Sequence, residues 1–152
     1  MSDAGQPIVE EVGFVSQRVQ TFTPEFAEGS PPEYRQRVEG GERLSLNIRF
    51  DEGSVALDSK AQADLKRLAA FMRQPTRQNR TLVLVGFADA EEGSPLLAEA
   101  LSNDRGNQVA DRMQQIGLRP REVRGMGGRL LLSGEDSPRG RARNRRVEVW
   151  LR

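Results

Sequence analysis

Residues 81–106 read TLVLVGFADAEEGSPLLAEALSNDRG, and this stretch decides the fold. Its first seven residues, 81–87, form a nearly continuous apolar run, which predicts a central strand buried on both faces. Gly86 allows the chain to leave the sheet or another group to come close. Ser94 and Pro95 then favour a helix start, with serine at the N-cap and proline at the first helical position. A strand followed by a helix indicates an α/β arrangement.

The helix that begins at Pro95 is expected to run to about Ile116 and to end at Gly117. Gly106 lies inside it and weakens its helix propensity. A close contact between the helix and the sheet at Gly106 would explain that choice of residue. Five apolar residues supply most of the stripe that should face the core, namely Leu97, Leu101, Val109, Met113 and Ile116.

Two elements are expected ahead of this unit. Apolar and polar residues alternate over 44–50, which is the period of two of a half-buried strand. After a loop, Asp58 or Ser59 can cap a second helix, and Ser59 with Gln62 fits a capping box. Pro75 stops that helix. One face of the helix is apolar and consists of Ala61, Leu65, Leu68, Ala69 and Met72.

Downstream, residues 122–126 are a weak strand candidate, and 133–143 are expected to be a loop or a short helical turn. Alternating residues over 147–151 predict a closing strand. The predicted order is β-α-β-α-β-β. We therefore expect an α/β (α+β) two-layer sandwich over residues 42–152, with an open mixed sheet of about four strands and two main helices.

Residues 1–41 differ from the rest of the chain. Residues 12–19 could make a short strand or two, but proline and glycine punctuate 21–41, which predicts a linker or loosely packed arm, partly disordered. Residues 1–6 lack the pattern of a secretory signal. We therefore expect either a cytosolic protein or a piece whose export signal lies upstream.

Composition excludes several function classes. The 152 residues include no cysteine and no histidine, so disulfides, thiol chemistry and histidine triads are impossible, and the commonest metal ligand is missing. No run approaches the roughly 20 apolar residues of a membrane span. These absences favour a binding module without a metal or cofactor over an enzyme. Carboxylate pairs such as Glu91 and Glu92 are adjacent in sequence, and we interpret them as solvated surface groups.

Charge also argues against nucleic acid as a partner. The 23 basic and 22 acidic side chains nearly cancel, giving a net charge of +1. The C-terminal arginines, 139, 141, 143, 145 and 146, could hold a polyanion, but only Trp150 lies near them for stacking. We interpret Arg139, Arg141 and Arg143 as a solvated basic edge.

Two motifs carry a family resemblance. Residues 86–106 are similar to the pattern G-H-T-D-x-x-G followed by N-x-x-L-S-x-x-R-A, and GRARNRRVEV, residues 140–149, is similar to G-R-x-x-N-R-R-V-E-I. With these motifs, residues 50–151, about two-thirds of the chain, resemble the OmpA-like peptidoglycan-binding domain. The matched positions in the first motif are Asp89, Gly93, Leu101, Ser102 and Arg105.

The resemblance implies non-covalent binding of peptidoglycan through the diaminopimelate of its stem peptide, and a place in the periplasm or cell envelope. Asp89 would contact the ammonium of diaminopimelate and Arg105 its carboxylate, a pairing that suits a two-pronged guanidinium. Such a module would anchor its parent protein to the cell wall. Further candidates for ligand contact are Phe87, Ala88, Gly93, Asn144 and Arg145.

Three departures from the pattern keep an alternative open. Phe87 and Ala88 replace the family histidine and threonine, the loop 89–93 is one residue longer, and Ala98 replaces an asparagine. A degenerate OmpA-like domain that acts as a protein–protein interaction module would show the same changes.

The two central residues also have structural interpretations. Asp89 could simply close a turn. Arg105 could be solvated, or pair with Asp104, Glu99 or Asp89.

Residues 1–20 resemble the end of a periplasmic solute-binding domain. This resemblance implies an upstream solute-binding domain in the same chain, cut at residue 1.

Overall fold

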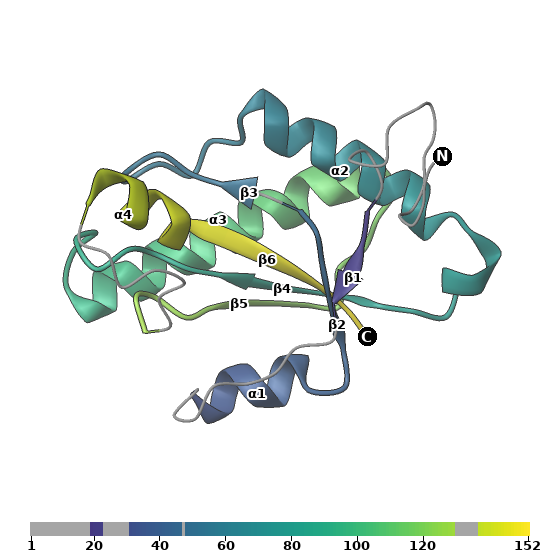
Figure 1. Cartoon of the computed structure of the whole chain (residues 1–152), viewed down its shortest axis with the longest axis horizontal. Helices are drawn as coiled ribbons and strands as arrows, with labels where there is room; N and C mark the ends of the chain where they lie inside the picture. Colours follow the sequence, from purple (N-terminus) through teal and green to yellow (C-terminus); the bar gives the residue numbers. More distant parts are fainter. Residues whose placement is uncertain (1–18, 23–30, 47, 130–136) are drawn as a thin grey trace.

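The computed structural model describes residues 19–22, 31–46, 48–129 and 137–152. Within them the chain forms a mixed sheet with helices on both of its faces, which confirms the predicted fold class (Figure 1). Over these residues the sheet has six strands where about four were predicted, because the strand expected over 44–50 is split in two and residues 21–22 add a strand at the edge. The strands are β1 (Thr21–Phe22), β2 (Glu42–Leu44), β3 (Ile48–Arg49), β4 (Leu82–Gly86), β5 (Glu122–Gly125) and β6 (Arg146–Leu151). The helices are α1 (Pro32–Val38), α2 (Ser59–Met72), the 3-10 turn η2 (Pro75–Arg77), α3 (Pro95–Gln115) and α4 (Pro138–Asn144).

Strand β4 is an interior strand of the sheet, paired on both of its edges, as its apolar run predicts. It pairs with β6 in antiparallel fashion and with β5 in parallel fashion, and all five of its residues are buried. The strand order is β1-β2-β6-β4-β5, with β3 also paired to β6. The chain leaves β4 at Gly86, and the residues that follow it therefore gather at one end of the sheet.

The two long helices begin where the sequence predicts. The Ser94 side chain caps α3 by accepting from the Leu97 N–H, with Pro95 at the first helical position. For α2 the cap is Asp58, whose carboxylate accepts from the Ala61 N–H at 2.8 Å, so Asp58 rather than Ser59 serves this role.

Two glycines allow α3 to lie close to the sheet. A Cβ atom at Gly86 would overlap the carbonyl oxygen of Ser102, and one at Gly106 would come within 2.6 Å of a Val123 methyl group. The close helix–sheet contact predicted at Gly106 is therefore confirmed. This contact fixes the position of α3 along β4 and β5, and therefore places Arg105 beside the end of β4.

The strand predicted over 44–50 is interrupted. Strands β2 and β3 both pair with β6, but four residues separate Arg43 from Ile48 where only two separate their partners Trp150 and Val147. The two extra residues break the strand into two short pieces. The predicted apolar alternation survives the break, since Leu44, Leu46, Ile48 and Phe50 are all buried.

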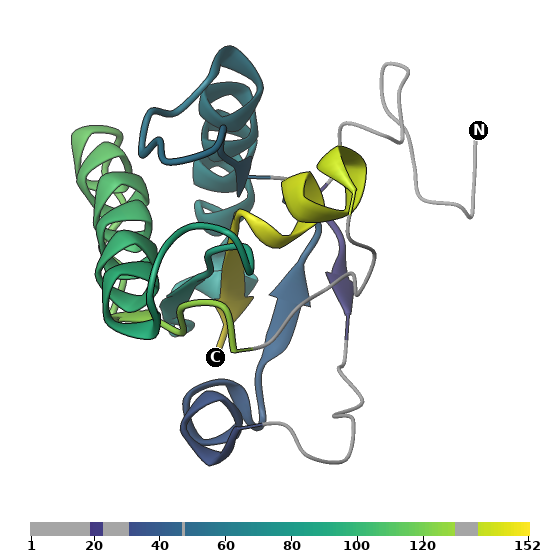
Figure 2. The same cartoon turned by 90° about the vertical axis from the view of Figure 1, so that its left-hand side faces the viewer.

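Helix α1 corrects the prediction of a loosely packed arm over 21–41. Residues 32–38 form this helix against the face of the sheet opposite α2 and α3, and Tyr34 and Val38 are buried there (Figure 2). Proline at its first position starts the helix instead of breaking it. The domain boundary at residue 42 stays a prediction.

The sheet therefore separates two apolar cores. The larger lies under α2 and α3 and includes Leu65, Leu68, Leu84 and Val109. The smaller lies under α1 and consists of Tyr34, Val38, Val83, Val85, Phe87, Met126 and Trp150.

Some predictions fall outside the described residues. These are residues 12–18 of the strand predicted over 12–19, residues 1–18 of the segment 1–20 that resembles a solute-binding domain, and the first part of the turn predicted over 133–143. The latter part of that turn forms α4. Among the described helices, none is both long enough and apolar enough to cross a bilayer.

Candidate functional site

Arg105 is completely buried in α3, and each of its five N–H groups has an acceptor. Its Nε donates to the Ser54 carbonyl at 2.9 Å, and its two terminal nitrogens donate to the carbonyls of Phe87 at 3.1 Å and Asp51 at 3.2 Å. The remaining two N–H groups donate to the Glu92 carboxylate, at 2.7 Å to Oε1 and 2.5 Å to Oε2. The guanidinium thus holds a carboxylate in the bidentate geometry that suits it.

Glu92, in the loop that follows β4, supplies the carboxylate that the Arg105 guanidinium holds. Its side chain is only 1% exposed. Besides the two bonds from Arg105, its Oε1 accepts from the Asp89 N–H at 2.9 Å and its Oε2 from the Gly53 N–H at 2.7 Å. We call the set of donors formed by the Arg105 guanidinium and the backbone N–H groups of Gly53 and Asp89 the Arg105 carboxylate site.

These contacts shift the ionisation of Glu92. Burial raises the pKa of its carboxyl, but the hydrogen bonds from Arg105, Gly53 and Asp89 and the positive charge of Arg105 lower it by more, so the pKa lies below its usual range. Glu92 is therefore ionised in the folded protein at neutral pH.

Asp89 lies beside this site but pairs with a different arginine. Its Oδ2 accepts from Nη1 of Arg145 at 2.8 Å, its Oδ1 accepts from the Glu91 N–H at 2.7 Å, and the residue is 1% exposed. Arg145 also donates through Nε to the Phe50 carbonyl at 2.8 Å. Two carboxylates and two guanidiniums thus meet at the end of β4, and their charges balance.

The structure brings Asp89 and Arg105 to the same end of the sheet, but joins them through Glu92. The Asp89 backbone and the Arg105 side chain both donate to the Glu92 carboxylate. The partners suggested for Arg105 from the sequence, which were Asp104, Glu99 and Asp89, are therefore wrong. The interpretation of Glu92 as a solvated surface group is also wrong, whereas Glu91 is exposed as expected.

The other candidate residues differ in their burial and in their contacts with the site. Phe87 contributes its carbonyl to Arg105, while its ring is buried in the smaller core, with the Arg146 guanidinium 3.8 Å above it. The Ala88 N–H donates to the Gly127 carbonyl, and Asn144 is buried at the end of α4. Gly93 is exposed with a φ of 111°, a left-handed conformation that lets the lengthened loop turn Glu92 inward.

The C-terminal arginines separate into different roles. Arg145 belongs to the site, Arg146 is buried and bonds to Glu148, and Arg139 and Arg143 are exposed. This distribution agrees with a solvated basic edge at Arg139 and Arg143, whereas Arg141 is only partly exposed.

Sequence reasoning did not identify Glu92 or the backbone of Gly53 as parts of the site. The available signal was the extra residue in the loop 89–93, which marks the place where this chain departs from the OmpA-like pattern. Loop length alone does not tell which way a side chain turns.

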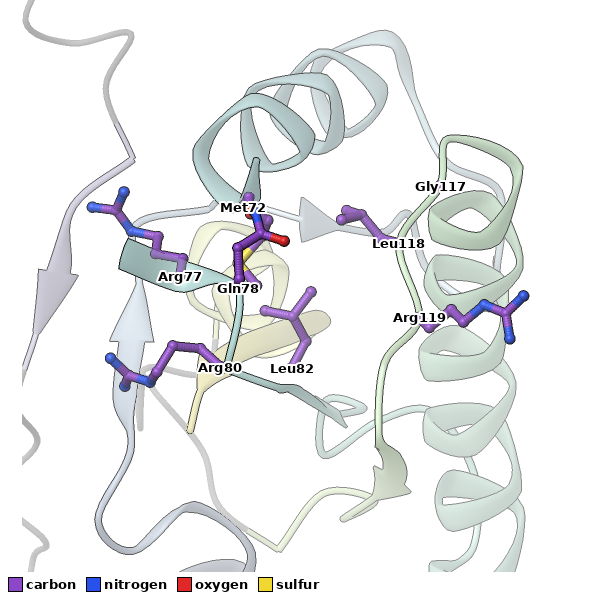
Figure 3. A pocket seen from close by; sticks show the side chains of 8 residues that line it. All are labelled: Met72, Arg77, Gln78, Arg80, Leu82, Gly117, Leu118 and Arg119. Atoms are coloured by element: carbon purple, nitrogen blue, oxygen red, sulfur yellow. The ribbon is translucent and has the colours of Figure 1, made fainter. Parts of the chain in front are cut away.

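A pocket of about 290 Å³ lies at the other end of the sheet, near the start of β4 (Figure 3). Met72, Gln78 and Leu118 point toward it, whereas the guanidinium of Arg119 points away. Because Asp89 follows the opposite end of β4, this pocket is not the predicted site. Among the residues with described positions, no group of three or more histidine, cysteine, aspartate or glutamate side chains could hold a metal ion.

The fold and the site together define an α/β domain with helices on both faces of its sheet and a buried carboxylate held by arginine at the end of β4. Residues 49–145 match the model of the OmpA family, and the chain belongs to that family. A search of curated proteins finds no match.

Solved structures share this fold. The peptidoglycan-associated lipoprotein of Burkholderia pseudomallei is 20% identical with a TM-score of 0.64, and the match covers 71% of this chain and 91% of that one. The C-terminal domain of Helicobacter pylori MotB is 21% identical with a TM-score of 0.60, covering 70% and 83% of the two chains. The OmpA-like domain of FopA1 from Francisella tularensis is 19% identical with a TM-score of 0.61, covering 88% and 93%.

Proposed function

We propose that this chain binds peptidoglycan non-covalently, through the diaminopimelate of the stem peptide. The observation that carries the proposal is the Arg105 carboxylate site, which converges on one carboxylate beside the buried Asp89. Membership of the OmpA family and the fold shared with a peptidoglycan-associated lipoprotein support the same class of ligand.

The chemistry of the site suits a zwitterionic end group. The free end of diaminopimelate in a stem peptide presents an ammonium and a carboxylate on one carbon. Each Asp89 oxygen already accepts one hydrogen bond and has capacity for a second, which an ammonium would supply. The Arg105 carboxylate site, whose donors include the backbone N–H of Asp89, takes a carboxylate. No step of bond making or breaking is required, and the proposed role is binding, not catalysis.

Such binding would place the protein in the periplasm or cell envelope and attach its parent chain to the cell wall. The structural relatives support this location, because several are periplasmic domains of MotB. An upstream solute-binding domain in the same chain remains part of the proposal and would be the cargo of that attachment.

Co-sedimentation with purified sacculi tests the function. We expect the protein to pellet with sacculi that contain diaminopimelate, and to pellet much less with sacculi that carry lysine at that position. Asp89→Asn and Arg105→Lys should each reduce the bound fraction at least about tenfold, which corresponds to the loss of one charge-assisted contact.

Arg119→Ala is the matched control, because Arg119 is exposed and its guanidinium points away from the pocket at the far end of the sheet. Equal pelleting of the wild type and both site variants would reject the assignment of the site. Equal pelleting with both kinds of sacculi would reject diaminopimelate as the determinant.

A second function has one specific observation in its favour. Leu96 and Leu97, in the first turn of α3 next to the site, are 79% and 63% exposed. Exposed neighbouring leucines suit a protein interaction module, the alternative suggested by the altered loop. A pull-down from periplasmic extract tests this function. It is favoured if the wild type recovers a protein that Leu96→Ser and Leu97→Ser fail to recover, and if the wild type does not pellet with sacculi.

A further inference from the structure

The Arg105 carboxylate site is already full. Both guanidinium N–H groups that could face a ligand carboxylate donate to Glu92, and the other three donate to backbone carbonyls. The Gly53 and Asp89 N–H groups donate to the same carboxylate. A ligand carboxylate therefore meets no free donor in this site.

We propose that Glu92 is an intramolecular competitor, which occupies the Arg105 carboxylate site in the free protein and must leave it before a ligand carboxylate can bind. For peptidoglycan the proposal rests on the function proposed above. The occupation of the site by Glu92, and its replacement by another carboxylate, can be tested without that function.

The chain geometry makes this competition strong. Glu92 lies three residues from Asp89, so its carboxylate is tethered beside the donors at a local concentration on the order of millimolar or above. A ligand that binds only the open form has its affinity reduced by the fraction of molecules in which Glu92 has left. If that fraction is about 1%, the affinity falls about a hundredfold.

The competition also imposes a requirement on the ligand. A ligand carboxylate that replaces Glu92 one for one gains little, since the same donors are used. A net gain needs a second contact at the site, and the neighbouring group that can supply it is the carboxylate of Asp89, which suits an ammonium. We therefore expect selection for ligands that carry both groups close together over simple carboxylates.

The loop is built to hold Glu92 in one position and is tied to the site through few other contacts. Its side-chain bonds reach the β3–α2 loop through Gly53 and α3 through Arg105. Gly93, at its end, has the left-handed conformation that reverses the chain. Ala90 and Glu91, which link Asp89 to Glu92, are exposed, so release of Glu92 requires no apolar core residue to move.

Chemical rescue tests the occupation of the site. Glu92→Ala should lower the melting temperature, because it leaves the buried Arg105 without a carboxylate. Sodium acetate should then raise it by about 3 °C or more relative to sodium chloride of equal ionic strength, since acetate binds only the folded form. The wild type and Glu91→Ala, whose side chain is exposed, should show no such difference.

Binding of a diaminopimelate stem peptide tests the competition. We expect Glu92→Gln, which removes the charge and keeps the shape, to bind the peptide at least about tenfold more tightly than the wild type. If Glu92→Ala does not fold in sodium chloride, recovery of its folded form in sodium acetate supports the proposal equally. The peptide affinity of Glu92→Gln then still tests the competition.

The outcomes separate the two proposals. Acetate rescue with no peptide binding in any variant supports the occupation of the Arg105 carboxylate site by Glu92 and rejects the peptidoglycan function. Peptide binding that is equal in the wild type and Glu92→Gln, with no acetate rescue, keeps the function and overturns the role of Glu92. Weaker binding by Glu92→Gln than by the wild type also overturns it, because Glu92 would then support the ligand.

Discussion

Glu92 and Arg105 form a bidentate ion pair of two side chains that are at most 1% exposed, with N–O distances of 2.7 and 2.5 Å. The pair joins the loop after β4 to α3, and through Gly53 and the carbonyls of Asp51 and Ser54 it also holds the loop before α2. One pair of charges thus fixes α3, the loop that directly precedes it, and a loop 39 residues earlier in the chain at one end of the sheet.

Removal of the guanidinium should therefore destabilise the domain strongly. Arg105→Ala leaves the Glu92 carboxylate buried without its partner, and three carbonyls lose a donor. We expect a loss of about 3–5 kcal/mol in the free energy of unfolding, measured by urea denaturation. Gln108→Ala, on the exposed side of the same helix, should change it by no more than about 0.5 kcal/mol. A loss of similar size in both variants would contradict a special role for the pair.

The same pair predicts a pH dependence of stability. The hydrogen bonds of Arg105, Gly53 and Asp89 hold the folded-state pKa of Glu92 below its ordinary value of about 4.3. The ionised carboxylate thus stabilises the fold at pH values above about 4.3, and this contribution disappears as the pH falls through the lower, folded-state pKa. We expect the stability difference between the wild type and Glu92→Gln to be greatest near neutral pH and to shrink under acid. A difference that grows as the pH falls would contradict the assigned charge state.

The sequence predicted the parts of the fold that local patterns determine. Ser94-Pro95 marked the start of α3, and the continuous apolar run marked β4 as the central strand. Gly106 was correctly interpreted as a close contact with the sheet. These features are local because caps, periodicity and glycine packing leave their signal within a few residues.

Other features depend on contacts that no local pattern records. Helix α1 lies in a segment whose prolines and glycines suggested a linker, and it is held by the burial of Tyr34 and Val38 on the sheet. Within the site, the motif singled out Asp89 and Arg105, and the structure brings both to the same end of β4. The inward turn of Glu92 could not be predicted, since it depends on a guanidinium 13 residues away.

The contact of α3 with β4 predicts a steric effect at Gly86. A methyl group there would overlap the backbone carbonyl of Ser102, which cannot move without shifting the helix. Gly86→Ala should lower the free energy of unfolding by about 3 kcal/mol, near the upper end of overpacking costs. Gly128→Ala is the control, because its nearest neighbour would lie at 3.4 Å, and should cost less than about 1 kcal/mol. If the two variants are equally stable, the packing described for Gly86 is wrong.

Helix α1 should contribute to stability if it covers the second face of the sheet. Val38 is completely buried against the smaller core, so Val38→Ala should cost about 2 kcal/mol from lost apolar burial and the remaining cavity. Arg35→Ala, on the exposed side of the helix, is the control. A chain shortened to begin at residue 42 should be less stable than the full chain and should bind apolar dyes at the uncovered Phe87 and Trp150. Equal stability of the two chains would show that α1 lies outside the folding unit.

The most direct test of the central claim is a crystal structure of the protein with a diaminopimelate stem peptide bound. We predict that the ligand carboxylate lies in the Arg105 carboxylate site, the ligand ammonium contacts Asp89, and the Glu92 side chain has turned out of the site. A bound peptide located elsewhere, with Glu92 still paired to Arg105, would contradict the account.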